Sequence, residues 1–282
     1  MKILLANIGV SEVNGEFTTK LMAPLWKKNF GLVRREDTEI VLRTSEWGIL
    51  GMDGMFNPAM NALNTQLVFQ IAKNADKEGF DAVMVTCFGD PYLQQLRGFL
   101  DIPVVGIGEA SYKMASMMGK RFGVVHVNEA VLDEAREQIE SYGMTKYFAG
   151  IVPTTESGPE QVMAMKDARG AIRAFTECGR KLIAMGAEVL IPACGLMSPS
   201  LRMASGCEDE YPDGFTNVDG VPIFDVLGCS LKYTEMLVDL KRAGENWVSR
   251  KGAYALPTQA MLDSGYMTLE DERIKYWDVQ LF

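Results

Sequence analysis

The stretch that decides the fold runs from Gly79 to Ser111 and reads GFDAVMVTCFGDPYLQQLRGFLDIPVVGIGEAS. Residues 82–86 form a short apolar run, which is typical of a strand buried on both faces of a parallel sheet. Cys87 stands where this strand should end, and the turn residues 88–91 (FGDP) follow it. Because ligands of open α/β sheets bind outside the carboxyl ends of the strands, Cys87 is a candidate for chemistry.

A second copy of this pattern occupies residues 186–194 (GAEVLIPAC). In both copies the cysteine, Cys87 or Cys194, lies eight residues after a glycine. The other repeated segments are 102–105 (IPVV) with 221–224 (VPIF), and 2–7 (KILLAN) with 121–126 (RFGVVH). A lone buried cysteine is usually an inert packing residue, but two at matching positions of a repeat favour a shared function. A pseudo-twofold arrangement would let both thiols face one cleft.

The repeat predicts an α/β fold of two similar Rossmann-like subdomains with mostly parallel sheets. We expect a pseudo-twofold axis to relate them and the active site to lie in the cleft between them. The first half takes residues 1–112 plus 222–244, the second half 113–221, and a C-terminal extension 245–282. The extension is rich in spaced aromatic residues, which favours an arm that packs on a partner subunit of a homo-oligomer. The rim of the protein's own cleft is the second possibility for this arm.

Apolar runs and amphipathic stretches alternate along both halves and predict their elements. Strands are expected at residues 2–8, 39–43, 82–86, 104–107, 121–127, 148–152, 189–191 and 221–225. Helices are expected at about 16–29, 60–77, 92–99, 110–118, 129–142, 168–185 and 228–243. The apolar, glycine-rich loop 45–58 is either a lid over the cleft or a contact within the fold or between subunits.

The composition limits the class of partner. Of the 282 residues, 48% are hydrophobic and 23% charged, as in ordinary globular proteins. A net charge of −9 argues against nucleic acid and anionic membrane as partners, and no apolar run approaches the ~18 residues of a membrane span. Five cysteines without a C-x-x-C pair, and a single histidine, indicate neither a disulfide framework nor a metal site. We therefore expect a cytoplasmic protein that binds a small molecule and no metal.

Residues 106–111 (GIGEAS) partly imitate a dinucleotide-binding fingerprint, but they follow the wrong strand and end in serine. We reject nucleotide binding and interpret them as a strand-to-helix turn. Its N–H groups are expected to point into the cleft, where such groups can hold an anionic oxygen.

Several of these segments resemble the aspartate/glutamate/hydantoin racemase superfamily, and the hydantoin racemase branch most closely. The residues that carry the resemblance are 87–91 (CFGDP), 103–110 (PVVGIGEA), 186–188 (GAE) and 194–195 (CG), within a region of roughly residues 1–240. The family's first strand normally ends in a loop similar to Asn-Pro-Asn-Thr-Ser. The corresponding loop in this chain is 7–11 (NIGVS), in which Asn7 and Ser11 match that pattern.

The resemblance implies inversion of configuration at a carbon acid without a cofactor, with Cys87 and Cys194 as acid and base. Such a reaction needs a base on one face of the carbon and an acid on the other, and a free thiol with a pKa near 8.5 suits both tasks. Backbone N–H groups after each cysteine can stabilise the thiolate or a developing enolate oxygen. The expected substrate-binding residues are Asn7, Ser11, Thr86, Phe88, Gly89, His126, Gly195 and Leu196.

Other functions remain open from the residues alone. A maleate-type cis–trans isomerase would use one cysteine as a covalent nucleophile, and a ring-opening hydrolase would use Cys87 in that way. An arylmalonate-type decarboxylase needs one cysteine only, so the second cysteine disfavours it. A non-catalytic protein that binds small molecules is the alternative outside enzymes.

Overall fold

The computed structural model describes residues 1–8, 17–46, 48, 54, 57–154, 158–265 and 275–282. Ser11, most of the loop 45–58 and part of the C-terminal extension lie outside these ranges. Predictions for those residues therefore stay predictions.

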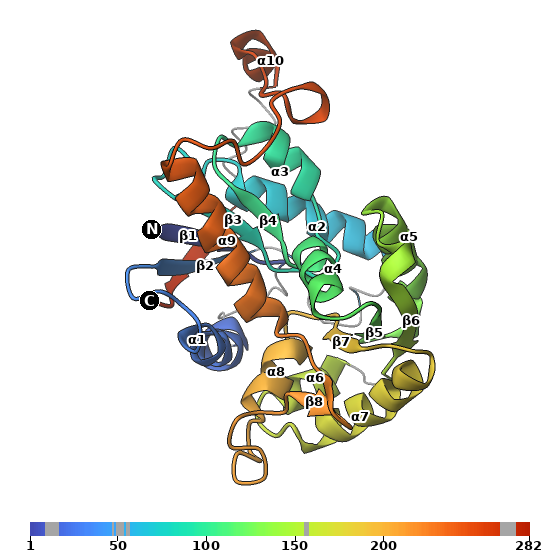
Figure 1. Cartoon of the computed structure of the whole chain (residues 1–282). Coiled ribbons are helices and arrows are strands. Elements are labelled where there is room, and N and C mark those ends of the chain that lie inside the picture. The colour runs from blue at the N-terminus through green and yellow to red at the C-terminus, as the bar shows by residue number, and fades with distance from the viewer. Residues whose placement is uncertain (9–16, 47, 49–53, 55–56, 155–157, 266–274) are drawn as a thin grey trace.

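Two separate sheets form the two halves (Figure 1). The strands of the first sheet, in spatial order, are β10 (Tyr276–Gln280), β2 (Glu39–Ser45), β1 (Lys2–Ala6), β3 (Ala82–Val85) and β4 (Val104–Gly106). The second sheet has the order β6 (Phe148–Pro153), β5 (Phe122–His126), β7 (Val189–Pro192). All neighbours within both sheets are parallel except β10 and β2. The predicted fold of two mainly parallel α/β halves is confirmed.

Helices cover both faces of the first sheet because its inner strands are apolar on both faces. On one face, α2 (Pro58–Ala72) and α3 (Leu93–Phe99) pack against side chains such as Leu4 and Val83. On the other face, α1 (Ala23–Gly31) and α9 (Val226–Arg242) pack against side chains such as Ile3 and Met84. A π-helical turn at Phe17–Met22 leads into α1.

The second sheet is covered by α7 (Arg169–Ala184) on one face, while α5 (Leu132–Ser141) lies beside β6. The buried residues of α7 include Ile172, Phe175 and Leu182, spaced by three and seven residues on one face of the helix. The short helices α6 (Gly158–Ala164) and α8 (Met197–Met203) pack on α7 and on each other. A two-stranded hairpin, β8 (Asn217–Val218) with β9 (Val221–Pro222), precedes α9.

Helix α4 (Ile107–Met118) joins the halves (Figure 1). It contacts β4 and α9 of the first half and β5 and β7 of the second. Its Tyr112 ring stacks on Phe122 of β5, with 5.4 Å between the ring centroids. One continuous core therefore runs through both halves, from Ile3 of β1 to Ile191 of β7.

Two predicted boundaries were wrong for identifiable reasons. The expected strand 221–225 pairs as β9 only at Val221–Pro222, and beyond it Ile223 makes a single bridge to Leu190. The side chain of Asp225 accepts from the N–H of Gly228 at 3.0 Å and so begins α9 at Val226 instead of at 228. The helix expected at 110–118 starts earlier, at Ile107, because a distant carboxylate caps its first turn, as described below.

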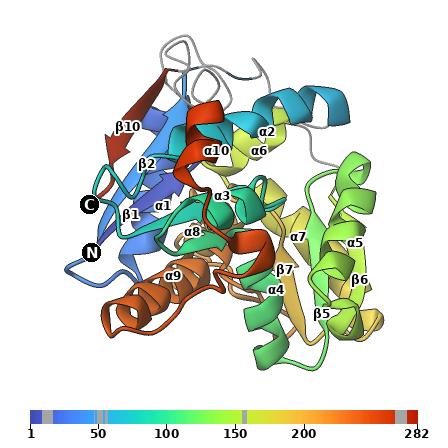
Figure 2. The ribbon, with the colours of Figure 1, turned by 90° about the horizontal axis from the view of Figure 1, so that it is seen from above.

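The C-terminal extension ends in a strand that packs on its own chain, and the expected contact of the extension with a partner subunit stays a prediction. Its last strand, β10, pairs antiparallel with β2 of the same chain and forms the outer edge of the first sheet (Figure 2). Arg43 of β2, which is 4% exposed, fixes this strand through Asp278, with N–O distances of 2.7 and 2.9 Å. The same guanidinium pairs with Glu78 at 2.7 Å and lies 4.2 Å from the centre of the Tyr276 ring. Further back, α10 (Gln259–Ser264) extends away from the body of the molecule (Figure 1). Within the described ranges, no helix has the length and apolarity needed to cross a bilayer.

Candidate active site

A cavity of about 210 Å³ lies at the carboxyl ends of the strands, between the two halves. The residues Asn7, Cys87, His126 and Cys194 reach it from the ends of β1, β3, β5 and β7 respectively. Every predicted site residue within the described ranges lines this cavity; these are Asn7, Thr86, Cys87, Phe88, Gly89, His126, Cys194, Gly195 and Leu196. Ser11 lies outside the described residues.

The turns that follow the two cysteines touch each other. A Cβ atom on Gly195 would lie 2.7 Å from the carbonyl oxygen of Thr86, so only glycine permits this approach. The indole of Trp26, from α1 in the first half, donates from Nε1 to the carbonyl oxygen of Gly195 at 2.9 Å. These contacts hold the Cys194 turn of the second half against the Cys87 turn of the first.

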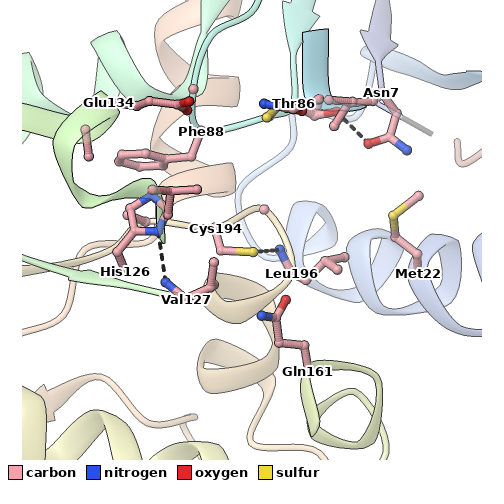
Figure 3. A pocket seen from close by; sticks show the side chains of 18 of the residues that line it. Asn7, Met22, Thr86, Phe88, His126, Val127, Glu134, Gln161, Cys194 and Leu196 are labelled. Carbon is pink, nitrogen blue, oxygen red and sulfur yellow. Dashed lines mark hydrogen bonds between the residues drawn. The ribbon is translucent and has the colours of Figure 1, made fainter. Parts of the chain in front are cut away.

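Each thiol receives an N–H from the residue two positions further along the chain. The N–H of Leu196 donates to Cys194 Sγ at 3.3 Å (Figure 3). The N–H of Gly89 faces the thiol of Cys87 and acts to lower its pKa. Burial outweighs that hydrogen bond and raises the pKa of Cys87 to about 12, with smaller contributions from the negative charges of Asp90 and Cys194. Cys87 therefore holds its proton at neutral pH.

His126 stands beside the Cys87 turn, with its ring at right angles to Phe88 and 6.4 Å between the centroids. Burial lowers the pKa of His126 to about 4, so its imidazole is neutral at physiological pH. The N–H of Val127 donates to Nδ1 at 3.0 Å, which leaves the ring proton on Nε2 (Figure 3). His126 can thus donate one hydrogen bond without carrying a charge.

Asn7 and Thr86 form a polar pair across the ends of β1 and β3. The hydroxyl of Thr86 lies 3.2 Å from the carbonyl oxygen of Ala6 and 3.3 Å from Asn7 Oδ1 (Figure 3). Both side chains are buried. This pair fixes the orientation of the Asn7 amide at the edge of the cavity.

The prediction that the N–H groups after Gly106 point into the cleft was wrong. The carboxylate of Asp90 accepts the N–H groups of Gly108 and Glu109 at 2.9 and 2.6 Å and so caps α4. The turn approaches so closely that a Cβ on Gly108 would lie 2.2 Å from the carbonyl oxygen of Phe88. The group that these donors hold is therefore a carboxyl group of the protein itself. Their role is to fix the Cys87 turn.

Helix α5 of the second half also holds the Cys87 turn. Gln138 Nε2 donates to the carbonyl oxygen of Phe88 at 2.8 Å, and the hydroxyl of Tyr142 donates to Asp90 at 2.9 Å. Burial raises the pKa of Asp90 to about 7, although the hydrogen bonds from Gly108 and Glu109 oppose the rise.

Several lining residues escaped the sequence analysis, among them Trp26, Asn61, Glu134, Gln138 and Gln161. They belong to helices, and their periodicity alone does not say which helix face meets the cavity. Glu134 is the only charged side chain among the described residues that line the cavity. In the described part of the chain, no group of three or more His, Cys, Asp or Glu side chains is placed to bind a metal ion.

Residues 18–233 match the protein family described as Asp/Glu/Hydantoin racemase. The chain belongs to this family. Among its curated relatives, the hydantoin racemase of Pseudomonas sp. (strain NS671) is 30% identical over 208 residues, which span 73% of this chain and 76% of the relative. The hydantoin racemase of Paenarthrobacter aurescens is 26% identical over 211 residues, 74% of this chain and 80% of the relative. The chain is therefore an isomerase of the racemase type.

Solved structures show the same fold. The allantoin racemase from Klebsiella pneumoniae superposes with a TM-score of 0.69 at 24% identity, covering 92% of this chain and 94% of that one. The allantoin racemase from Pseudomonas fluorescens gives a TM-score of 0.67 at 22% identity, covering 91% and 97%.

Proposed function

We propose that this racemase inverts a neutral ring of the hydantoin class by proton transfer between Cys87 and Cys194, without a cofactor. The observation that carries the proposal is the pair of thiols in one cavity whose described lining holds no lysine or arginine. A free amino acid would bring a carboxylate that needs a cationic partner. A hydantoin ring is uncharged, and its carbonyl group already acidifies the carbon that must lose its proton.

In the proposed reaction one cysteine, as thiolate, takes the proton from the ring carbon, and the electron pair of that C–H bond moves into the enolate. The other cysteine, as thiol, then gives its proton to the opposite face of the carbon and becomes the thiolate. The two roles exchange for the other enantiomer. Donors for the enolate oxygen are available in the neutral Nε2–H of His126 and in the backbone of the two turns.

Deuterium exchange tests this function directly. Each enantiomer of a 5-monosubstituted hydantoin, incubated with the enzyme in D₂O, should lose its C5–H signal as its optical activity decays. Dialysis against a chelator should leave this rate unchanged. Exchange of aspartate or glutamate in place of hydantoins would contradict the proposed substrate class.

A covalent mechanism of the maleate-isomerase or ring-opening type is the competing enzyme function. Mass spectrometry of enzyme quenched during turnover separates the two mechanisms, because only the covalent one adds the mass of a substrate to a cysteine. An adduct on Cys87 would overturn the proton-transfer mechanism. An absence of exchange on every hydantoin would favour the non-catalytic alternative.

The proposal includes the cellular compartment and the oligomeric state of the enzyme. None of the five cysteines, all of which lie within the described residues, forms a disulfide bond, which favours a reducing compartment such as the cytoplasm. A homo-oligomer stays a prediction, which light scattering of the purified chain would test.

A further inference from the structure

One polar side chain of the cavity, that of Gln161, has a buried hydrogen-bond donor without an acceptor among the described residues. Gln161 of α6 is 4% exposed and lines the cavity. Its amide end points toward the turn that carries Cys194 and Leu196 (Figure 3). Among the described residues, no atom accepts a hydrogen bond from its buried Nε2.

A buried donor without an acceptor destabilises the folded protein, because the amide loses its water and gains nothing in return. Such a group is expected to have a partner that is present only when the site is occupied. The partner must be a hydrogen-bond acceptor, since the NH₂ group can only donate. It must also suit a cavity whose described lining offers no cation, which favours a neutral carbonyl oxygen over a carboxylate.

We propose that Gln161 is a specificity-determining residue whose Nε2 donates a hydrogen bond to a ring carbonyl oxygen of the substrate. This inference rests on the proposed function, because it takes the substrate to be a hydantoin-like cyclic amide. The residue selects for a ring that presents an oxygen beside the Cys194 turn. It takes no proton and gives none.

The test separates binding from catalysis with 5,5-dimethylhydantoin, a probe that has both ring carbonyl groups but no hydrogen on C5. Its dissociation constant is measured by calorimetry for the wild-type chain and three variants. Gln161→Met keeps the length of the side chain but removes the donor, and Gln161→Glu puts an acceptor in its place. Gln94→Met changes an exposed glutamine of α3 and serves as the matched control.

We expect Gln161→Met to bind the probe roughly tenfold more weakly, the usual loss for one neutral hydrogen bond. Gln161→Glu should bind more weakly still, since two acceptors would face each other. Gln94→Met should bind as the wild type does. The urea midpoint of Gln161→Met should equal or exceed that of the wild type, because the variant no longer buries an unsatisfied donor.

Two outcomes would overturn the inference while leaving the proposed function intact. One is that Gln161→Met binds the probe as tightly as the wild type while both racemise 5-monosubstituted hydantoins. The other is that Gln161→Met unfolds at lower urea, which would give Nε2 a structural partner. If the wild-type chain neither binds the probe nor exchanges C5–H on any hydantoin, the proposed function fails as well.

Discussion

The Cys87 turn and the Cys194 turn both direct a backbone N–H at their thiol, from Gly89 and Leu196, but different contacts hold them in place. The Cys87 turn is fixed by a buried carboxylate, Asp90, and by the side chains that surround it. The Cys194 turn is fixed by neutral contacts, the Trp26 indole and the close approach of Gly195 to Thr86. The two halves thus share the backbone N–H that faces each thiol, but they do not share the contacts that hold the two turns in place.

The side chains that hold each turn in place include residues of the other half. Gln138 and Tyr142 of the second half hold the turn of Cys87, and Trp26 of the first half holds the turn of Cys194. The geometry of each thiol therefore depends on how the two halves dock. Disturbing one interface residue should misplace a cysteine that belongs to the other half.

The largest effect is expected from the thiols themselves. Cys87→Ser and Cys194→Ser should each lower racemisation by at least roughly 10³-fold, since a serine hydroxyl is a far weaker acid than a thiol. Each variant should still exchange deuterium from one enantiomer only, because one thiol remains. Chiral chromatography and NMR in D₂O measure the two quantities. Cys207→Ser, a buried cysteine outside the cavity, is the control. Racemisation in both directions by either active-site variant would refute the two-base mechanism.

A smaller loss is expected when the two turns are pushed apart. In Gly195→Ala the new Cβ would meet the backbone oxygen of Thr86 at 2.7 Å, and backbone cannot rotate away. A displacement near 1 Å between catalytic groups reduces turnover by about 10²-fold. Gly170→Ala, where a Cβ meets nothing within 4 Å, is the matched control. Wild-type turnover in Gly195→Ala would show that the contact of the turns does not set the distance between the thiols.

Two buried titratable groups, Asp90 and His126, are expected to change the stability of the fold with pH in opposite directions. Burial raises the pKa of Asp90 from 3.8 to about 7, so the folded chain keeps a proton that the unfolded chain loses, and stability falls as pH rises from about 4 to 7. Burial lowers the pKa of His126 from 6.5 to about 4, so stability rises with pH over about 4 to 6.5. The two contributions oppose each other in the wild type.

Two single variants separate the contribution of Asp90 to the pH dependence of stability from that of His126. Asp90→Asn should make the free energy of unfolding rise more steeply with pH between about 4 and 6.5, and His126→Asn should make it fall, each by up to about 1.4 kcal/mol per pH unit. The ionisable neighbours of Asp90 are Glu109, Tyr112, Tyr142 and Cys87, none of which gains or loses a charge partner in His126→Asn. Urea unfolding at pH 4.5, 5.5 and 6.5 gives the slopes. Parallel slopes in both variants would rule out these assignments.

The smallest effect on turnover is expected at β10, the antiparallel edge strand of the first sheet. Asp278→Asn weakens the pairing of β10 with the buried Arg43 and should lower the free energy of unfolding by about 1 kcal/mol, because Asp278 is 40% exposed and Glu78 still pairs. Turnover per folded molecule should not change. Asp219→Asn alters a similar pair with the exposed Arg180 in the second half and should have no measurable effect. Equal losses from the two variants would contradict the role of Arg43 as an anchor.

The sequence predicted which residues at the strand ends line the cavity. Short apolar runs that end in Cys87 and Cys194 identify buried parallel strands, and the carboxyl ends of such strands meet at one edge. Contacts made by helices were not predictable in this way. Gln161 and Gln138 lie on amphipathic helices, and which face meets the cavity follows from the docking of the halves. The first turn of α4 is capped by Asp90, which is 17 residues before Ile107. Strand β10 pairs with a strand over 200 residues away. Neither contact can be read from a local sequence pattern, because its partners are distant in the chain.

Trp26 gives the enzyme an optical signal of its own. Of the described tryptophans, only Trp26 lines the cavity, where its indole is already hydrogen-bonded to the carbonyl oxygen of Gly195. The emission of an indole depends on the water and the dipoles around it, so a ligand that fills the cavity alters the fluorescence of Trp26 without any label. Stopped-flow records of that emission would time substrate entry and the settling of the Cys194 turn separately from the chemistry.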